Sequence, residues 1–598
     1  MPAHKRVLFI ERTLRNEKLG IMYLSASLKA AGHHADLIQT CKEDLDAIIH
    51  EYRPHFVAFS VTTGEHRGAL ETAWYTKQRY GIPNIFGGPH CTFFPELAYE
   101  SDVDFVVQGQ GERAIVDVVE GRVAPGFVKA DPPSQLDDLP IPDRDIFYKY
   151  NNFRDNPMKN VITSRACPYK CAYCFNHSQL ALAQMDGQTG QWFRRRSVHD
   201  VVAEINAIGD RYPLEKVLFI DDSFIQSTAW LDTFLKHYAH NVRLPWLCSV
   251  RVNRLTGQLA ERMSQCGLEM VNYAIESADP DVQRRLLHRG SIANRHVIQA
   301  ISLFERCGVR SRMQNMIGLP LANPLEDALN TLQFNMRHRV TDSWCSIFQP
   351  YPRTALGQYC VDQGYATEDQ LYHCAESFFE ESRLHIPDRR KLNALQKIWY
   401  FAVDARLSLD LVQILIRGEY DEQTCRRLQE LRFRCARERL YALDGMPGNA
   451  RRRAQGDERV LGASQSKEHG QSPTAHLTRT ALSGTNALPE FSHILEHVRF
   501  GPQEQEHLRR YMCGEQVYSP PIYTIDDDTG ELADPAVSIY IRGSGDPNRA
   551  DIRRMPTAHF MRGMAEVRTA LCTGAQATCA VGQEPPVEHK GCLAGGID

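Results

Sequence analysis

The chain has 598 residues, of which 43% are hydrophobic, and this length suits about three or four domains with apolar cores. Its formal net charge of -4 gives no general electrostatic reason to bind nucleic acid or an anionic membrane. No apolar stretch approaches the ~20 residues of a membrane helix and the first residues lack a signal-peptide pattern, so we expect a cytoplasmic protein without a membrane partner.

From Arg6 to about Gly121, short β-branched or aromatic runs alternate with helical patterns, as is typical of a doubly wound α/β sheet. The predicted strands are Val7–Ile10, Ala35–Ile38, Phe56–Ser60, Asn84–Phe86 and Phe105–Val107. Ligands of such sheets lie at the carboxyl ends of the strands. The loops that follow the strands are therefore the places where a ligand is expected.

Three of these loops carry hydroxyl, glycine or acidic residues. These candidate ligand contacts are Ser60, Thr62, Gly87, Gly88, Gly109, Gly111 and Glu112. Hydroxyls and unshielded glycine backbone let a large planar or phosphate-bearing ligand approach closely. The glycines alone fit equally well a flavodoxin-like module that binds another nucleotide, or a module without a ligand.

Prolines and acids dominate residues 127–152, a composition that breaks helices and central strands and predicts a linker. Beyond it, short strands separated by helical stretches predict six βα repeats, which form a partial (β/α)6 barrel. These strands are Val161–Thr163, Val217–Ile220, Leu247–Val250, Met270–Ala274, Arg312–Ile317 and Cys345–Phe348. Active sites of β/α barrels lie at the carboxyl ends of the strands.

The first of these strands leads into a loop with Cys167, Cys171 and Cys174. Iron–sulfur clusters are usually held by four cysteines, so three in one loop leave one iron open to a substrate or cofactor. The alternatives are a zinc site or three unrelated thiols, but zinc normally takes four ligands from paired elements, and no second pair of matching spacing follows. The chain has 17 cysteines and no secretory features, which indicates reduced thiols and a few ligands.

The cysteine loop resembles the CxxxCxxC signature of radical S-adenosylmethionine enzymes, including the aromatic Tyr173 before the last cysteine. The resemblance implies a 4Fe-4S cluster whose open iron chelates the methionyl end of S-adenosylmethionine. It also places Tyr173 at the cofactor.

The segments before this loop resemble the cobalamin-binding domain that precedes many radical S-adenosylmethionine domains, with its GGPH and GxGE blocks, although Gln110 stands where glutamate is usual. This implies a Rossmann-like fold and a bound cobalamin. No DxHxxG motif supplies a histidine to cobalt. Arg67 is a candidate for the lower face of cobalt, and His66 is an equally available ligand there.

Polar residues at the barrel-strand ends resemble further blocks of the family. Asp221 and Asp222 are predicted to hold the methionyl ammonium, with a helix N-cap as the alternative for both. Glu276, in a block similar to GIES, is implied to face the ribose. The segment from Gln314 to Gly318 is implied to contact adenine through its backbone.

Tyr351 and Arg353 follow the last strand in a block that resembles PYPGT, with arginine in place of glycine. We predict them as catalytic or substrate-facing residues, because Arg353 can pair with a substrate carboxylate in bidentate fashion. A solvated arginine and a core tyrosine are the alternatives. Arg251, beyond the third strand, is a further carboxylate-binding candidate or a surface arginine.

The C-terminal third is predicted to be mainly helical. The domain organisation is a cobalamin-binding domain at 1–126, a linker at 127–152, a radical S-adenosylmethionine barrel at 153–364, a helical cap over the barrel mouth at 365–444, a flexible linker at 445–485, and a substrate-related region of unknown fold at 486–598. Within the last region, Ala536–Ile541 has the pattern of a strand.

The resemblance implies a methyltransferase that moves a methyl group from S-adenosylmethionine via methylcobalamin to a carbon of a small natural-product precursor, for example an amino acid such as tryptophan. Its partners would be this small molecule and an electron donor such as flavodoxin or ferredoxin. The alternatives are an oxidative cyclase or ring-rearranging enzyme with the same cofactors, a cobalamin or iron–sulfur sensor, and, last, a methylthiotransferase.

Overall fold

The computed structural model describes residues 4–185, 193–373, 379, 381–441, 491, 494–495, 498–512, 524–525 and 532–533. The chain splits into two compact units: of the described residues, those up to Asp404 and those at 524–525 and 532–533 belong to the first, and those from Ala405 to Tyr441 and from 491 to 512 belong to the second. The predicted flexible linker, the strand predicted over Ala536–Ile541 and most of the predicted C-terminal region lie outside the described residues. The predicted domain boundaries therefore stay predictions.

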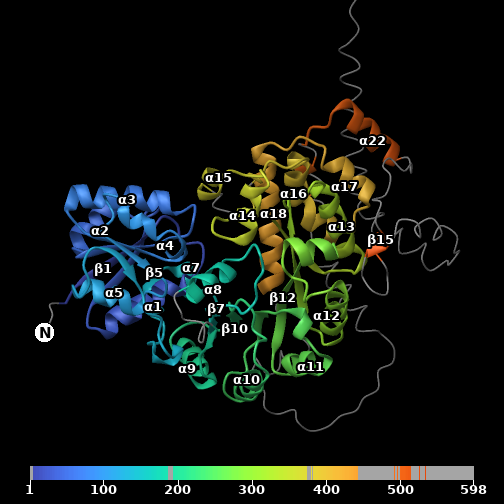
Figure 1. The fold of residues 1–598 in the computed structure, drawn as a ribbon. Helices are drawn as coiled ribbons and strands as arrows, with labels where there is room; N and C mark the ends of the chain where they lie inside the picture. The colour runs from blue at the N-terminus through green and yellow to red at the C-terminus, as the bar shows by residue number, and fades with distance from the viewer. Residues whose placement is uncertain are drawn as a thin grey trace, which may run out of the picture. The chain divides into compact units, whose positions relative to one another are not determined.

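The first unit begins with a six-stranded parallel sheet in the order β2-β1-β3-β4-β5-β6 (Figure 1). Its strands are β1 (Arg6–Glu11), β2 (His34–Gln39), β3 (Phe56–Ser60), β4 (Asn84–Gly87), β5 (Phe105–Gln108) and β6 (Gly126–Lys129). The helices between them are α1 (Leu19–Ala30), α2 (Leu45–Tyr52), α3 (His66–Tyr80), α4 (Pro89–Phe93) and α5 (Glu112–Val119).

Alternation along β1 explains why both faces of this sheet are covered. Val7 and Phe9 pack on one face with residues of α1 and α5. Leu8 and Ile10 pack on the other face with residues of α2 and α3. Successive side chains of a strand point to opposite faces, so a continuous apolar strand needs helices on both sides. The doubly wound α/β fold predicted from the sequence is confirmed.

The predicted linker begins inside a strand. Residues 126–129 form β6, which pairs in parallel with β5, so the sheet has one strand more than expected. The proline and acid content of the segment predicted that the sheet ends before it. However, β6 is an edge strand that pairs with β5 alone, and edge strands tolerate such residues nearby. The remainder of the segment contains two short helices, α6 (Asp145–Tyr148) and α7 (Asn151–Arg154).

The second sheet also has six parallel strands, ordered β14-β13-β12-β11-β10-β7, so each strand lies beside its successor and the barrel is partial. Its strands are β7 (Met158–Val161), β10 (Lys216–Phe219), β11 (Trp246–Ser249), β12 (Leu268–Glu276), β13 (Arg310–Ile317) and β14 (Asp342–Ile347). The helices are α8 (Phe175–Met185), α9 (Val198–Gly209), α10 (Thr228–Asn241), α11 (Gly257–Gln265), α12 (Asn294–Arg306), α13 (Pro324–Arg337), α14 (Ala355–Asp362), α15 (Glu368–Tyr372) and α16 (Arg389–Asp404). A short antiparallel ladder joins β8 (Ser164–Arg165) to β9 (Arg194–Arg195).

The first barrel strand starts earlier than predicted, at Met158 instead of Val161. Lys159, a residue type that usually indicates exposure, is fully buried here. Its ammonium donates to the carbonyls of Phe153 and Arg154, at 2.6 and 2.9 Å. Burial of this charge is tolerated because backbone carbonyls accept its hydrogen bonds. A search for apolar runs does not recognise a strand that begins with such a lysine.

The helical region predicted as one cap at 365–444 is divided between the two units. In the first unit, α16 packs along β14, where Trp399 donates to Ser343 and Gln396 donates to the Cys345 carbonyl. It covers the edge strand of the second sheet. The second unit contains α17 (Leu409–Leu415), α18 (Glu422–Tyr441) and α22 (Pro502–Met512).

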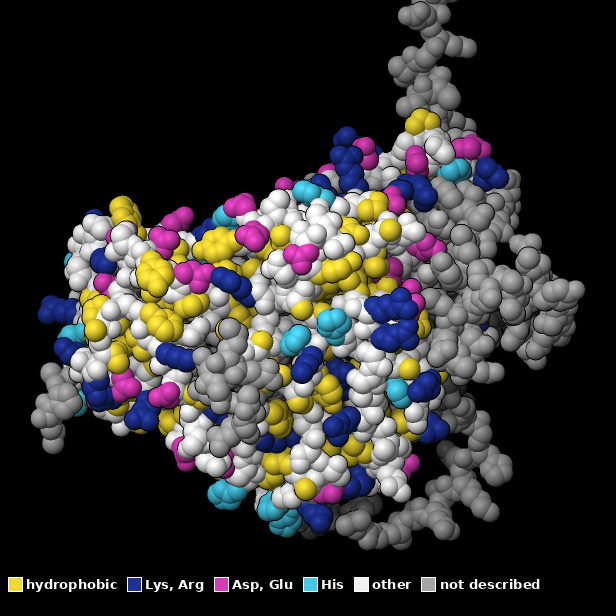
Figure 2. Space-filling model, viewed as in Figure 1, with side chains coloured by type: hydrophobic (Ala, Val, Ile, Leu, Met, Phe, Trp, Pro, Cys, Tyr) yellow, Lys and Arg dark blue, Asp and Glu magenta, His cyan; other side chains and the backbone are white. Residues whose placement is uncertain are grey.

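The described residues include no helix that is both long and apolar enough to cross a membrane. On the face drawn in Figure 2, basic and acidic side chains are interspersed with hydrophobic ones over the first sheet domain. Histidines gather at the lower edge of this view, and His199, His237 and His240 of α9 and α10 line a shallow groove.

Candidate active site

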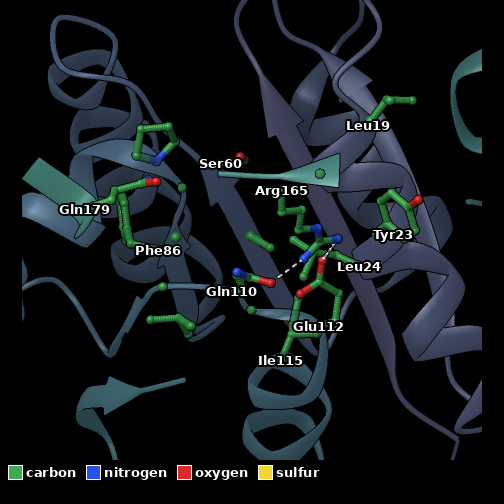
Figure 3. A pocket seen from close by; sticks show the side chains of 18 of the residues that line it. Leu19, Tyr23, Leu24, Ser60, Phe86, Gln110, Glu112, Ile115, Arg165 and Gln179 are labelled. Carbon is green, nitrogen blue, oxygen red and sulfur yellow. Dashed lines mark hydrogen bonds and ion pairs between the residues drawn. The ribbon is translucent and has the colours of Figure 1, made fainter. Parts of the chain in front are cut away.

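A cavity of about 460 Å³ lies at the carboxyl ends of the first sheet (Figure 3). Seven of the predicted site residues line it: Ser60, Gly87, Gly88, Gly109, Gly111, Glu112 and Asp222. Apolar strand residues such as Phe9, Phe86 and Val107 form the inner part of its lining. The rest of the wall comes from the second sheet domain, through Ser164, Arg165, Ala166, Asn176 and Gln179. An apolar cavity rimmed by glycine backbone fits a large organic cofactor.

Position 88 requires glycine, because the backbone of Val61 lies too close for a side chain. The φ of Gly88 is 93°, and a Cβ at this position would lie 2.9 Å from the amide nitrogen of Val61. Val61 is itself fixed, since its amide donates to the Gly87 carbonyl at 2.9 Å and its carbonyl accepts from His90 at 3.0 Å. This is the position in the GGPH block where only glycine fits.

Gly88→Ala is therefore expected to lower the free energy of unfolding by roughly 1–3 kcal/mol, the cost of a strained backbone conformation. The measurement is thermal unfolding of the cofactor-free protein. Gly87→Ala is the control, because a Cβ there meets no atom within 4 Å. Equal melting temperatures for the two variants would contradict the argument.

Thr62, Arg67 and His66 do not line this cavity. Thr62 is exposed and donates to Glu65 at 2.7 Å, and Arg67 is exposed in the first turn of α3. His66 is buried and stacks on His90, with ring centroids 3.9 Å apart. Burial lowers the pKa of His66 to about 4. The cobalt-facing role of Arg67 stays a prediction, whereas His66 faces the protein interior.

The three predicted cluster cysteines lie in the loop between β8 and α8. Their thiols are close enough that the charges of Cys171 and Cys174 act on Cys167, and burial raises the pKa of Cys167 to about 11. Among the residues that the structure describes, no three Cys, His, Asp or Glu side chains converge on a single metal ion. A cluster requires a different arrangement, with one thiolate on each of three irons.

Two nitrogen donors point at these sulfurs. Arg251 is buried, and its Nη1 lies 3.5 Å from the Cys171 Sγ. Its guanidinium carbon lies 3.6 Å from the centroid of the Tyr169 ring. Asn176 Nδ2 lies 3.7 Å from the Cys174 Sγ. Hydrogen bonds and positive charge beside the thiolates fit an iron–sulfur cluster, because both stabilise its electron-rich sulfurs.

The two predicted ammonium ligands have different surroundings. Asp221 is buried and accepts from the backbone and hydroxyl of Thr163, at 3.0 and 2.8 Å, and from the Ser164 hydroxyl. Asp221 thus holds in place the residues between β7 and the cysteine loop. Asp222 faces the cavity, and burial raises its pKa. Of the two, Asp222 is the one placed to meet a cationic ligand.

Tyr173 and Glu276 meet at the end of β12. The Tyr173 hydroxyl donates to Glu276 at 2.7 Å and accepts from Arg289 at 2.8 Å. Glu276 has a φ of 66°, and the pairing with β13 shifts register between Ala274 and Glu276. The structure therefore joins two predicted cofactor contacts through Arg289, which the sequence did not single out.

The predicted adenine contacts lie on the neighbouring strand. Gln314 is exposed on β13, and Gly318 follows the strand end with a φ of 73°. Between them, Asn315 is buried in a hydrogen-bond network with Asn335 and Ser343. This network holds the strand end whose backbone is implied to contact adenine.

A buried acid, Asp327 of α13, contacts the turn that follows Glu276. Asp327 accepts from the Ser277 hydroxyl, and burial raises its pKa from 3.8 to about 7. The raised pKa means that the folded state binds this proton more tightly than the unfolded state. Its stabilising effect is full below the unfolded pKa and is lost as the pH rises through about 7.

Asp327→Asn keeps a neutral side chain at all pH values. The melting temperature of D327N minus that of the parent protein is expected to increase between about pH 5 and pH 8. Thermal scans across this range measure the difference. A constant difference would mean that Asp327 does not titrate as its burial implies.

Arg353 lines a second cavity of about 450 Å³ together with Glu96, Phe93 and Leu182, whereas Tyr351 is not part of its lining. Arg353 Nη2 pairs with Glu96 of the first sheet domain at 2.8 Å. Arg353 has a φ of 62°, which explains why glycine is usual at this position. Tyr351 packs on Phe175, with ring centroids 5.1 Å apart.

Helix α8 lies between the two cavities. Asn176 and Gln179 line the first cavity, whereas His177, Ser178, Ala181 and Leu182 line the second. The helix begins at Phe175, directly after Cys174.

Comparisons with known proteins agree with this architecture. Residues 5–119 match the B12 binding domain, and residues 161–334 match the Radical SAM superfamily. The chain is 28% identical to an uncharacterized methyltransferase, PH0819, of Pyrococcus horikoshii, over 57% of this chain and 78% of that protein. It is 22% identical to cytidylyl-2-hydroxyethylphosphonate methyltransferase of Streptomyces wedmorensis, over 50% of this chain and 65% of that protein. The solved methyltransferase TsrM of Kitasatospora setae aligns at 15% identity and a TM-score of 0.49, covering 61% of this chain and 77% of that one.

A cobalamin-binding sheet followed by a radical S-adenosylmethionine barrel defines the class of protein. The two domains and the methyltransferase relatives support a cobalamin-dependent radical S-adenosylmethionine methyltransferase. Its cofactors are cobalamin, a 4Fe-4S cluster and S-adenosylmethionine. The family, the class of enzyme and the cofactors predicted from the motifs are confirmed, while the roles of the individual site residues stay predictions.

Proposed function

We propose that this methyltransferase transfers a methyl group from S-adenosylmethionine, by way of cobalamin, to a carbon of a small natural-product precursor that is an amino acid such as tryptophan. The observation that carries the substrate class is the Arg353–Glu96 pair at the second cavity. It offers one positive and one negative group to a ligand of matching size.

When bound, the cofactors supply a methyl donor, a cobalt carrier and a reducing centre. The protein holds and orients them. Cys167, Cys171 and Cys174 would hold the cluster, with Arg251 and Asn176 donating to sulfur. The remaining predicted contacts of S-adenosylmethionine are Asp221 and Asp222 for the ammonium, Glu276 for the ribose, and the backbone from Gln314 to Gly318 for adenine, with Tyr173 also at the cofactor.

The substrate argument begins with the accessibility of the ion pair. The side chains of Arg353 and Glu96 are 56% and 47% exposed, so their mutual attraction is weak and easily exchanged. A zwitterionic amino acid carries a carboxylate for Arg353 and an ammonium for Glu96. It can replace the internal pair without leaving either charge unmatched.

The apolar surroundings fit the rest of such a substrate. Phe93 and Leu182 line the cavity, and Phe94 lies under the Arg353 guanidinium at 5.2 Å. A volume of about 450 Å³ is in the usual range of small-molecule sites. An aromatic side chain would exclude water here while the two charges fix its orientation.

An electron donor such as flavodoxin or ferredoxin, in the reducing cytoplasm, would complete the system. A cyclase or a sensor built on the same cofactors remains the rival. Product mass separates a cyclase from a methyltransferase, because only methyl transfer adds a methylene unit per turnover. A sensor would bind the cofactors without consuming S-adenosylmethionine.

The test is turnover of the reconstituted full-length protein with methyl-labelled S-adenosylmethionine and three indoles: tryptophan, tryptamine without the carboxylate, and indole-3-propionate without the ammonium. We expect label in tryptophan and a KM on the order of 10-fold higher for each analogue, because one hydrogen-bonded charge is left unmatched.

Arg353→Gly keeps the left-handed backbone and removes the guanidinium. We expect R353G to lose the preference for tryptophan over tryptamine and to keep the preference over indole-3-propionate. Glu96→Gln should show the opposite pattern. Equal use of all three indoles by the parent enzyme would contradict the amino-acid proposal, and products without an added methylene would indicate the cyclase.

A further inference from the structure

One arginine connects the cysteine loop to the cobalamin-binding domain. Arg165, two residues before Cys167, donates through Nη1 to the Gln110 side chain at 2.8 Å and through Nη2 to Glu112 at 2.5 Å (Figure 3). The guanidinium lies over the Tyr23 ring of α1, 5.0 Å from its centroid. We call these contacts the Arg165 clamp.

The clamp is well shielded from water. The side chains of Arg165 and Glu112 are only 16% and 7% exposed, so their attraction is screened far less than that of a surface pair. Glu112 opens α5, where the helix dipole also stabilises its charge. The second carboxylate oxygen of Glu112 is buried without a hydrogen-bond partner, so Arg165 is the main group that satisfies this acid.

The backbone next to the clamp is strained. Ala166, between Arg165 and Cys167, has a φ of 68°, a left-handed conformation that costs free energy for any residue with a Cβ. Such a conformation persists only where the neighbours impose it. On one side, Arg165 is fixed by the clamp and by the pairing of β8 with β9. On the other side, the chain turns toward Cys167.

The same segment closes the cofactor cavity. Ser164, Arg165 and Ala166 line it together with Gln110 and Glu112. The clamp therefore joins the wall of the cobalamin cavity to the residue that leads into the first cluster ligand. A ligand that orders this wall also orders the turn at Ala166.

We propose that Arg165 is a positioning residue that makes cobalamin binding and cluster binding cooperative. Its clamp on Gln110 and Glu112 holds Ala166 in the left-handed turn that presents Cys167 to the cluster. Each cofactor favours the clamped arrangement, so each increases the affinity for the other, as linkage requires.

The test measures hydroxocobalamin affinity by absorbance for the full-length protein, once with the cluster reconstituted and once after its removal by chelation. For the parent protein we expect the cluster to tighten cobalamin binding by about 10-fold, within the usual range of coupling between sites. For Arg165→Met, this ratio should fall to about 1. Glu112→Gln, which keeps the shape and loses the charge, should give an intermediate ratio.

Arg194→Met is the matched control, because Arg194 pairs with Arg165 across the ladder but donates to the Pro133 carbonyl. It should keep the 10-fold ratio. R165M should take up less iron than the parent protein, because nothing then holds the turn at Ala166. Ala166→Gly, added to R165M, should restore the iron content, because glycine adopts the turn freely, and should leave the ratio at about 1. Thermal unfolding of the cofactor-free variants reports whether they fold.

An unchanged ratio in R165M would overturn the proposal, as would an equal loss in R194M. A parent ratio near 1 would also overturn it. If R165M fails to fold, E112Q becomes the deciding variant. A ratio of cobalamin affinities in E112Q equal to that of the parent protein would then contradict a role for the clamp.

Discussion

Replacing Cys171 by alanine is expected to abolish cluster assembly and methyl transfer together, while leaving cobalamin binding measurable. Cys171 is buried, and Arg251 donates to its sulfur, so alanine removes a cluster ligand and one of the acceptors of Arg251. With two thiolates left in the loop, a cluster loses one of its few protein ligands. Cys167→Ala and Cys174→Ala should behave in the same way.

The measurements are iron and sulfide content, the electron paramagnetic resonance signal after reduction, and the mass of the product. Cys41→Ala is the control, since Cys41 is exposed in the first sheet domain and lies outside the cysteine loop. It should keep the cluster and the activity. Retention of a full cluster in the Cys171 variant would show that other residues serve as ligands.

The largest expected loss of stability comes from Glu204. This fully buried carboxylate accepts from Arg144 of the predicted linker and from Arg196 beside β9, both of which are also buried. Glu204→Gln removes the carboxylate that the two guanidinium groups share. Among the described carboxylates, Arg144 then keeps only Glu17, at 3.7 Å, and Arg196 keeps only Asp200, at 2.6 Å. We expect the free energy of unfolding to fall by roughly 3–5 kcal/mol, as when one partner of a buried ion pair is removed.

The loss should depend on pH in a defined direction. Burial opposes the charge of Glu204, but the two arginines outweigh it and hold the pKa below 4.5. The stabilisation is therefore complete above the unfolded pKa and is lost as the pH falls through the folded pKa. Urea unfolding of E204Q and of the parent protein should differ most near neutral pH and converge in acid.

Asp155→Asn is the control for a surface pair. Its partner Arg154 lies 2.9 Å away, and the two side chains are 44% and 59% exposed. Such pairs contribute little, so this variant should unfold with the parent protein. Equal losses in E204Q and D155N would contradict the assigned role of burial.

The sequence predicted well whatever depends on local pattern. The strand at Phe56–Ser60 was predicted with its observed bounds, because an apolar run between polar loops has few other solutions. The three cysteines were found because their spacing is itself the chemical requirement. Glycine at position 88 was found through its motif, and the contact with Val61 explains why that motif exists.

What the sequence could not predict depends on pairing between distant residues. Arg165 resembles any surface arginine until folding places it against Glu112, 53 residues away in the chain. The start of β7 was missed because of Lys159. Two backbone carbonyls stabilise its buried ammonium, and no sequence pattern predicts such contacts. The pairing of Arg353 with Glu96 joins residues from separate domains, which a linear motif does not record.

Because α8 lies between the two cavities, the cofactor cavity and the proposed substrate cavity are lined by different faces of one helix. Residues on one face, such as Gln179, contact only the first cavity, and residues on the other, such as Ala181 and Leu182, contact only the second. Substitutions at the latter positions alter the shape and polarity offered to a substrate while the cofactor side keeps its lining. Under the proposed function, substrate specificity can therefore vary through one face of this helix while the other face keeps the lining of the cofactor cavity.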